Sequence, residues 1–307
     1  MNILIACDSF KGCMSSEQAC ECMKKGLRTA NPKWRVETYP MADGGEGFAQ
    51  VLCGYIRGKM VEVETVDLLG RRIKARYAWN EEQKLAVLDV ASCIGLNLYE
   101  RADRNPLAAS SFGVGLLMKD ALRRKCRKMI IGLGGSGSND GGMGILKAFG
   151  AKFYDAQRQL LAPNAYNLER IAFIDKRGFS FDRDVELIVA CDVKNRLLGK
   201  NGATYTFGRQ KGIFPSQMKR LDTAMAHYNQ KIDQTFHVDM DAFDGSGAAG
   251  GIGGVLLGVF RASMRPGIEV CMDYARFPEA LDKADLVFTG EGQTDAQTLY
   301  GKVPYGI

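Results

Sequence analysis

Acidic residues follow several short apolar segments of the chain, at the points where strands are predicted to end. The acidic residues at these predicted strand ends or in the adjacent loops are Asp8, Asp43, Glu46, Asp140, Asp192, Glu291 and Asp295. Any one of them alone is most often a turn residue or a helix cap. The strand ends of one α/β layer meet at one edge, however, so the set predicts a single acidic cleft.

Lysines and glycines share the loops of these acids. The lysines are Lys11, Lys211 and Lys302, and each alone is most simply a solvated charge. Carboxylates can hold Mg²⁺ and accept a hydroxyl proton, lysines can balance phosphate charge, and glycines let a backbone approach a ligand closely. Together these residue types indicate phosphoryl transfer.

The clearest candidate for a nucleotide loop lies between Met129 and Gly142. An apolar run with Ile130 and Ile131 predicts a buried strand, and the pattern after the glycines predicts a helix. A glycine-rich turn between them would present backbone N–H groups to a phosphate. Asp140 would repel that phosphate unless a divalent cation lay between them, so the loop predicts a metal–nucleotide site.

Elements of an α/β fold must position these loops. Hydrophobic patterns predict strands at 2–7, 35–41, 60–66, 73–79, 84–90, 152–154, 185–190 and 285–289, and helices at 48–55, 112–124 and 216–235. The chain opens with alternating strands and helices and then changes to a hairpin made by the third and fourth strands. This change predicts a domain boundary near residue 60.

Composition argues against several protein classes. The 307 residues carry a net charge of +6 without a basic run, which disfavours nucleic-acid binding. Nine cysteines without a CxxC pair indicate reduced thiols. No apolar run is long enough to span a bilayer, and the N-terminus does not resemble a signal peptide. These features predict a cytoplasmic protein that does not enter membranes.

A glycine pattern keeps a nicotinamide enzyme open as an alternative. Gly132, Gly134 and Gly137 form G-x-G-x-x-G between a predicted strand and a predicted helix, as in a dinucleotide-binding unit. An NAD(P)-dependent oxidoreductase would use this loop. Against it, Asp140 stands where a pyrophosphate would rest, and the other acidic loops would have no role. No Gly-Lys-Ser/Thr follows, so a Walker A loop is excluded.

The motifs together resemble those of the type I glycerate kinase family, in order along the whole chain. They are Asp8-Ser9-Phe10-Lys11-Gly12, Ala42-Asp43-Gly44-Gly45-Glu46-Gly47, Arg104-Asn105-Pro106, Gly134-Gly135-Ser136 to Gly142, Cys191-Asp192-Val193, Gln210-Lys211-Gly212, Gly247 to Gly251, Gly290-Glu291-Gly292 and Gly301-Lys302. The resemblance implies ATP- and Mg²⁺-dependent phosphorylation of D-glycerate, with 2-phosphoglycerate favoured. It also implies two α/β domains: a flavodoxin-like one from residues 1–60 and 263–307, and an inserted one from 61–262.

Roles follow from the resemblance and from residue chemistry. Asp192 or Asp43 would take the substrate hydroxyl proton, helped by Lys11 and Lys211. The nucleotide would meet Gly134, Gly135, Ser136, Gly137, Ser138, Asn139 and Lys302. The substrate would meet Asp8, Ser9, Lys11, Glu46 and Arg104. Mg²⁺ would lie near Asp140, Glu291 and Asp295.

The chain departs from the family pattern at several places, the mildest being Ser136-Gly137-Ser138 where Ser-Ala-Thr is more usual. Arg196 and Arg209 stand where the family usually has proline, which frees the backbone and adds positive charge. Family members also continue past the last motif, so the C-terminal end of the sheet is expected to be missing. That leaves a truncated, non-catalytic nucleotide-binding fragment as a second alternative. The sequence does not determine the oligomeric state, and a homo-oligomer stays open.

Overall fold

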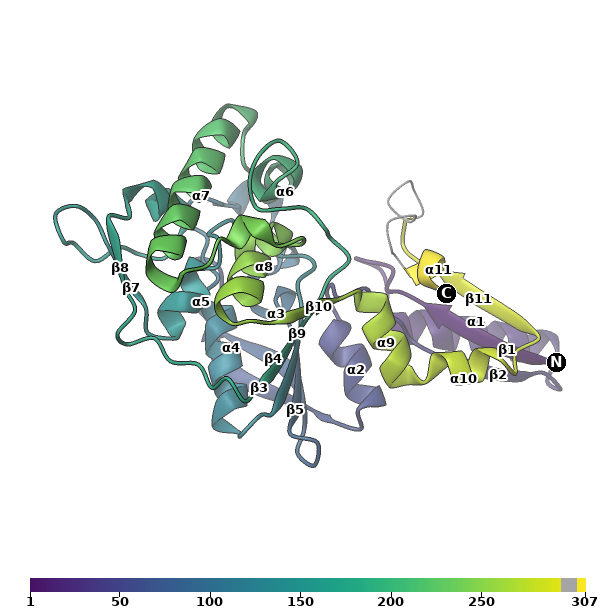
Figure 1. Ribbon diagram of the computed structural model, residues 1–307. Helices are drawn as coiled ribbons and strands as arrows, with labels where there is room; N and C mark the ends of the chain where they lie inside the picture. Colours follow the sequence, from purple (N-terminus) through teal and green to yellow (C-terminus); the bar gives the residue numbers. More distant parts are fainter. Residues whose placement is uncertain (294–302) are drawn as a thin grey trace.

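The structure, a computed structural model, describes residues 1–293 and 303–307 and forms two α/β lobes (Figure 1). The predicted fold class, α/β with a unit built from both chain ends, is confirmed. The small lobe consists of β1 (Asn2–Cys7), α1 (Ser16–Ala30), β2 (Arg35–Thr38), α9 (Gly267–Ala275), α10 (Phe277–Leu281), β11 (Leu286–Gly290) and α11 (Val303–Gly306). The Asp285 amide donates to the Asn2 carbonyl at 2.9 Å, so the start of β11 lies beside the N-terminus.

The large lobe contains the remaining strands and most helices. Its strands are β3 (Lys59–Val66), β4 (Arg72–Asn80), β5 (Leu85–Asp89), β6 (Lys128–Gly132), β7 (Lys152–Tyr154), β8 (Phe173–Asp175), β9 (Glu186–Ala190) and β10 (Ser263–Arg265). Its helices of six or more residues are α4 (Phe112–Arg123), α5 (Met143–Ala148), α6 (Ala203–Lys211) and α7 (Pro215–Phe236). Helix α2 (Phe48–Tyr55) packs against β4 and β5 and also against α9.

The small sheet is parallel, in the order β11-β1-β2. Its centre is β1, whose run Ile3 to Cys7 is fully or almost fully buried. Because β1 pairs with β11, the Asp8 amide donates to the Gly290 carbonyl at 2.9 Å. The loops that carry Asp8 and Glu291 therefore begin side by side, although they lie at opposite ends of the sequence.

The large sheet has the order β10-β9-β6-β5-β4-β3. Its first four strands run parallel, so their carboxyl ends share one edge. The register pairs Asp89 with Gly132, Gly132 with Ala190, and Ala190 with Arg265. This edge gathers four chain segments, and ligands of α/β sheets bind at such an edge.

A shared apolar core joins the lobes. It includes Leu4 and Ala6 of the small sheet, Ile130 and Ile188 of the large sheet, and Leu52 of α2. In Figure 1, α2 and α9 lie between the two sheets. Buried contact of this kind fixes the two sheets relative to one another, which lets loops from both contribute to one site.

The predicted hairpin of 60–66 and 73–79 is confirmed as β3 and β4, which pair antiparallel. Among the α-helices of five or more residues in the described part of the chain, α6, α9 and α10 were not predicted. The division into 1–60 with 263–307 and 61–262 stays a prediction. In the structure, however, β10 pairs with β9 in the large sheet, so the chain leaves that sheet only after Arg265. No helix in the described residues is both long and apolar enough to cross a membrane.

Candidate functional site

Four of the predicted acids meet where the two sheets adjoin, and we call Asp8, Asp43, Asp192 and Glu291 the acidic seam. The charges of Asp43 and Glu291 both raise the pKa of Asp8, and the charge of Asp43 also raises the pKa of Asp192. Like charges have this effect only at short range. Carboxylates from both lobes thus lie near one another, as the strand-end pattern predicted.

Asp8 is 6% exposed and directly follows β1. Burial, and then the charge of Asp43, raise its pKa to about 6. The Ser9 amide donates to Asp8 Oδ1 at 2.7 Å, and that bond and the Lys11 charge act in the opposite direction. A carboxylate that resists ionisation in this way gains from a nearby cation.

Asp192 lies two residues beyond β9, on the edge of the large sheet. Burial, and then the charge of Asp43, raise its pKa to about 7. Its Oδ1 accepts a hydrogen bond from the Gly267 amide at 3.2 Å, which fixes the carboxylate against the start of α9. A carboxylate with a pKa near neutrality can take up a proton at physiological pH and release it again.

Lys11 brings positive charge to the seam. Both the Lys11 ammonium and Asp43 Oδ1 are neighbours of the space beside the Gly45 Cα, and the Gly45 amide donates to Asp43 Oδ1 at 3.0 Å. Lysine and carboxylate therefore lie on the same side of this loop. A mobile ammonium beside a fixed carboxylate can bind a second anion, such as a substrate carboxylate or a phosphate.

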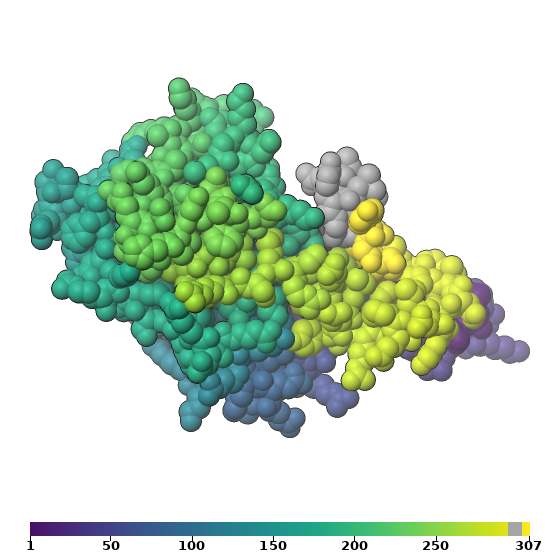
Figure 2. Space-filling model, in the orientation of Figure 1, coloured from purple at the N-terminus to yellow at the C-terminus, as the bar shows by residue number. Residues whose placement is uncertain are grey.

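Glycines let the loops of the two lobes touch through bare backbone. The Gly134 amide donates to the Gly44 carbonyl at 2.9 Å. A Cβ at Gly134 would overlap the Gly45 Cα, and a Cβ at Gly267 would overlap the Asp43 carbonyl. Figure 2 shows the yellow-green residues of α9, which begins at Gly267, against the green surface of the large lobe.

The predicted nucleotide loop is more enclosed than its glycines suggested. The Gly134 and Gly137 amides donate to the carbonyls of Gly44 and Ile94, at 2.9 and 2.7 Å, so neither is directed at a ligand. The side chains between Gly135 and Asp140 are buried, and they belong to Ser136, Ser138 and Asn139. Only the start of the loop, at Gly134 and Gly135, reaches the surface.

Asp140 is not placed as a metal ligand would be. It is 0% exposed, and its Oδ2 accepts from the Ser111 amide at 2.7 Å, the Ser111 hydroxyl at 2.8 Å and the Gly144 amide at 3.1 Å. Its Oδ1 accepts from the Gly142 amide at 3.3 Å. Burial raises its pKa, and these four donors oppose that effect. Asp140 therefore joins α5 to the start of α4, and its predicted place at the Mg²⁺ site, directly or through water, stays a prediction.

Lys211 is also buried, with 2% of its surface exposed. Its ammonium donates to the Ser138 carbonyl at 2.6 Å and to the Ser136 hydroxyl at 3.3 Å. Burial lowers its pKa to about 7, and the charge of Asp140 acts in the opposite direction. Lys211 thus supports the predicted nucleotide loop from its buried side, through Ser136 and Ser138.

Two other predicted residues, Arg104 and Glu46, have partners outside the acidic seam. The Arg104 guanidinium donates to the Gln210 carbonyl at 2.8 Å and so connects its loop to the end of α6. Glu46 Oε1 accepts from the Asn97 amide group at 2.7 Å. Asp295 and Lys302 lie outside the described residues, so their predicted roles stay predictions.

Three nearby residues were not predicted, and one of them is Glu269, whose charge, after burial and the charge of Asp43, also raises the pKa of Asp192. Asp89 ends β5 and is buried next to the start of α2. Asn97 holds Glu46 in the contact described above. The signal for Asp89 was present, because it too is an acid at a strand end, but no glycine follows it and the predicted strand ran past it to residue 90.

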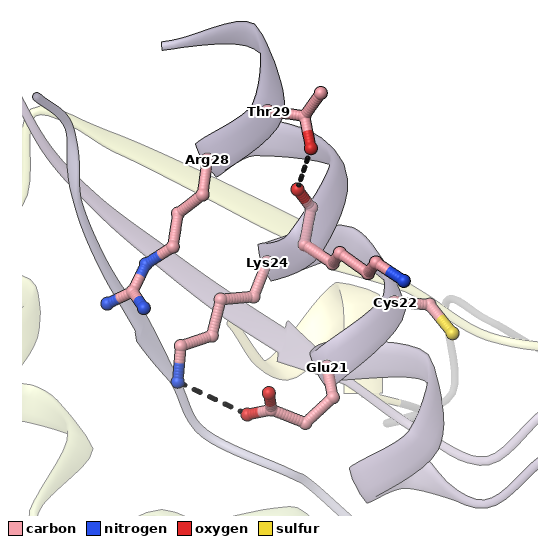
Figure 3. Close-up of a pocket in the computed structure, with 6 residues that line it drawn as sticks. Glu21, Cys22, Lys24, Arg28 and Thr29 are labelled. Atoms are coloured by element: carbon pink, nitrogen blue, oxygen red, sulfur yellow. Dashed lines mark hydrogen bonds and ion pairs between the residues drawn. The ribbon is translucent and has the colours of Figure 1, made fainter. Parts of the chain in front are cut away.

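A hollow on the outer surface of α1 has different chemistry. It is lined by Glu21, Cys22, Lys24, Lys25, Arg28 and Thr29, none of which belongs to the acidic seam. Figure 3 shows Lys24 directed at Glu21, and the two side chains pair at 3.2 Å. Lysines and an arginine on an exposed helix face are a solvated surface, so we assign the chemistry to the seam.

Comparisons with known proteins place the chain in a family. The model of the glycerate kinase family matches residues 3–307. A Bacillus cereus protein named glycerate kinase is 36% identical over 100% of this chain and 81% of its own. A protein of Escherichia coli named glycerate 2-kinase has the same identity and the same coverage of both chains. A crystal structure named for glycerate kinase 2 of Salmonella typhimurium LT2 has a TM-score of 0.87 and 40% identity, over 100% of this chain and 82% of that one.

The matched ranges include both the acidic seam and the glycine-rich loops. They favour the kinase prediction over an NAD(P)-dependent oxidoreductase that would use Gly132, Gly134 and Gly137, and they confirm the prediction of a glycerate kinase at the level of the family. The chain belongs to the glycerate kinase family.

Proposed function

We propose that the protein transfers the γ-phosphoryl group of ATP, with Mg²⁺, to the 2-hydroxyl of D-glycerate. The family membership supports glycerate as the substrate. The observation that carries the proposal is the juxtaposition of Asp192 with Asp43 at the carboxyl edge of two sheets. Phosphoryl transfer depends on positioning and on charge, and this edge supplies both.

Asp192 is the base. Its pKa of about 7 lies close to the pH at which a general base works best. As the substrate oxygen forms its bond to the γ-phosphorus, the bond from that phosphorus to the β–γ bridging oxygen breaks, and the hydroxyl proton passes to Asp192. Burial, and then the charge of the neighbouring Asp43, raise this pKa, which is why we assign the base role to Asp192.

The seam fits Mg²⁺ by the chemistry of its donors. Asp8 and Glu291 offer hard oxygen donors, and burial, the charge of Asp43 and then the charge of Glu291 disfavour ionisation of Asp8 unless a cation balances it. No group of three or more His, Cys, Asp or Glu in the described residues could hold a metal by itself. Mg²⁺ is commonly held by one or two carboxylates together with substrate phosphates, so this arrangement suits a metal that arrives with ATP. Bound there, Mg²⁺ would neutralise charge on the transferred phosphoryl group.

Lys11 and Ser9 are the groups we assign to the substrate carboxylate. Both belong to the loop after β1, and the Lys11 ammonium lies beside Asp43. Placed there, the ammonium would hold glycerate with its hydroxyl near Asp192. The exposed start of the nucleotide loop, at Gly134 and Gly135, would approach the phosphates of ATP, while Lys211 keeps that loop in place.

The test is a turnover assay with purified protein, D-glycerate and ATP, with and without Mg²⁺. We expect ADP formation only with Mg²⁺, and ³¹P NMR of the product should show 2-phosphoglycerate. L-glycerate is the matched control substrate and should react much more slowly. Formation of 3-phosphoglycerate would overturn the assigned hydroxyl, and reduction of NAD(P)⁺ with glycerate would favour the oxidoreductase.

A melting experiment addresses the second alternative, a fragment without catalysis. A protein that binds ATP·Mg²⁺ must melt at a higher temperature in its presence. A shift without turnover would identify a binding protein, and absence of both would refute the proposed function. We also propose that the enzyme works in the cytoplasm, and light scattering on the same sample would report whether it forms a homo-oligomer.

A further inference from the structure

Asp89 is a buried acid for which the proposed mechanism has no use. It is the last residue of β5 and is 6% exposed. Its Oδ1 accepts from the Ser92 amide at 2.9 Å, and its Oδ2 accepts from the Ala49 amide at 3.3 Å. Burial raises the pKa of Asp89 to about 6, and its hydrogen bonds, which include one from the Gly47 amide, oppose that effect.

The bond to Ala49 places Asp89 at the beginning of α2. The residue before this helix is Gly47, which has a φ of 85° and no side chain that could cap the helix. The first amides of a helix need acceptors from elsewhere, and a carboxylate is favourable at the positive end of the helix dipole. Asp89 supplies that carboxylate from a strand of the large sheet, 40 residues away in the sequence.

The start of α2 is also the end of the loop that carries Asp43. Residues 43–47 connect this acid directly to the helix, so whatever fixes the first turn of α2 also limits where Asp43 can lie. Two further contacts hold the same loop to the large lobe, from Gly134 to the Gly44 carbonyl and from Asn97 to Glu46. Of the three groups that the large lobe contributes to these contacts, Asp89, Gly134 and Asn97, Asp89 carries the charge.

The sheet register connects Asp89 to the other acid of the mechanism. Asp89 pairs with Gly132 and Gly132 with Ala190, and Asp192 stands two residues beyond Ala190. A rigid parallel sheet thus carries both the anchor of the Asp43 loop and the strand that ends near Asp192. The distance between Asp43 and Asp192 therefore depends on the alignment of β5, β6 and β9 in the large sheet.

We propose that Asp89 is a positioning residue for phosphoryl transfer: by capping α2 from the edge of the large sheet, it holds Asp43 beside Asp192. This proposal rests on the proposed function, since it assigns the effect of Asp89 to that reaction. Asp89 does not touch the reacting atoms. Its removal should therefore slow the chemical step and leave nucleotide binding almost unchanged.

The test compares Asp89→Asn with Asp155→Asn. Asp155 is the control because it is also 6% exposed and accepts two backbone amides, from Gln157 and Gln159, in a loop outside the acidic seam, where it also pairs with Arg170 at 3.2 Å. Asp89→Asn should lower kcat by about 10- to 100-fold, the range expected when a catalytic group is misplaced, while KM for ATP stays within about twofold. Asp155→Asn should leave both constants close to those of the wild type.

Hydrogen exchange gives a readout that does not depend on activity. In Asp89→Asn, peptides covering residues 43–50 should exchange faster, whereas those covering residues 128–132 of β6 should not change. Unchanged exchange at 43–50 together with a kcat near that of the wild type would overturn the proposal. A wild-type protein that does not turn over glycerate would refute the proposed function, and the exchange experiment would still decide whether Asp89 holds the loop.

Asp89→Glu provides the same test if the asparagine variant does not fold. It keeps the charge and moves it by one methylene, so faster exchange at 43–50 and a lower kcat at unchanged KM for ATP are expected. Exchange and kcat both equal to those of the wild type would contradict the positioning role.

Discussion

Asp43 and Asp192 follow strands of different sheets, yet the charge of Asp43 is, after burial, the next cause that raises the pKa of Asp192 to about 7. Two loops make this possible. The Asp192 carboxylate accepts from the Gly267 amide, and the bare Cα of Gly267 lies against the Asp43 backbone. The base of the proposed reaction thus depends on contact between the lobes.

Replacement of the base should abolish most turnover. Asp192→Asn keeps the shape of the side chain and its bond from Gly267 but cannot accept the hydroxyl proton. A general base contributes roughly 10²- to 10⁴-fold, and kcat should fall by about that factor. Steady-state kinetics with D-glycerate measure the change, and Asp155→Asn serves as the control for loss of a buried acid. A kcat within a few-fold of the wild type would remove Asp192 from the mechanism.

Turnover should depend on the ionisation of Asp192. Because the base must be deprotonated, kcat/KM should rise with pH through about 7 and level off above it. The rise should be absent from the residual activity of Asp192→Asn. A wild-type profile that is flat between pH 6 and 8 would show that no group of this pKa controls the reaction.

The same acid should reduce the stability of the free enzyme at high pH. Its pKa in the folded state is raised to about 7, well above the ordinary value of an aspartate, so the folded protein binds the proton more tightly and loses stability as the pH rises towards 7. Asp192→Asn cannot ionise and should melt about 2–5 °C above the wild type at pH 8. At pH 4 the difference should largely vanish.

Scanning calorimetry without ligands at both pH values makes this comparison. An equal difference in melting temperature at pH 4 and pH 8 would mean that ionisation of Asp192 is not its cause. A lower melting temperature of the variant at pH 8 would contradict the direction of the pKa shift.

A methyl group at position 267 should push the two loops apart. In Gly267→Ala the new Cβ would overlap the Asp43 carbonyl, which is backbone and cannot turn away. We expect a loss of about 1–3 kcal/mol in the free energy of unfolding from overpacking, and a kcat at least about tenfold lower because Asp43 shifts. Urea unfolding and steady-state kinetics measure the two effects.

Gly26→Ala is the control for this substitution. Gly26 lies inside α1, where a Cβ would meet nothing within 4 Å. Alanine there should stabilise the protein by about 0.4–1 kcal/mol and leave kcat unchanged. If Gly267→Ala behaved in the same way, the tight contact between Gly267 and Asp43 would have no functional role.

Sequence patterns identified the elements whose residues obey a clear period. Helix α7 was predicted as 216–235 and extends from Pro215 to Phe236, and β9 was predicted at nearly its observed bounds. Helix α6 was missed because a polar, glycine-bearing stretch has no apolar period, although its last residue, Lys211, is buried. Tertiary contacts decide such a helix, and they are not visible in the local sequence.

The same limit applies to the site. The local sequence around an acid in a glycine-rich turn is the same whether the acid faces a ligand or caps a helix. Asp43 and Asp140 both stand next to glycines, yet Asp43 belongs to the seam while Asp140 is buried against Ser111. Asp89 was hidden for the opposite reason, since it falls inside a predicted strand without a glycine to mark it. Only the packing of the two sheets separates these roles.

The most direct test of the account is a double-mutant cycle between Asp43 and Asp192. Residues that act as one unit give effects on kcat that are far from additive. If both acids work at one site, Asp43→Asn combined with Asp192→Asn should be little slower than the slower single variant. A double variant whose loss in kcat equals the product of the two single losses would show that the acids act independently, and would contradict a shared site between the lobes.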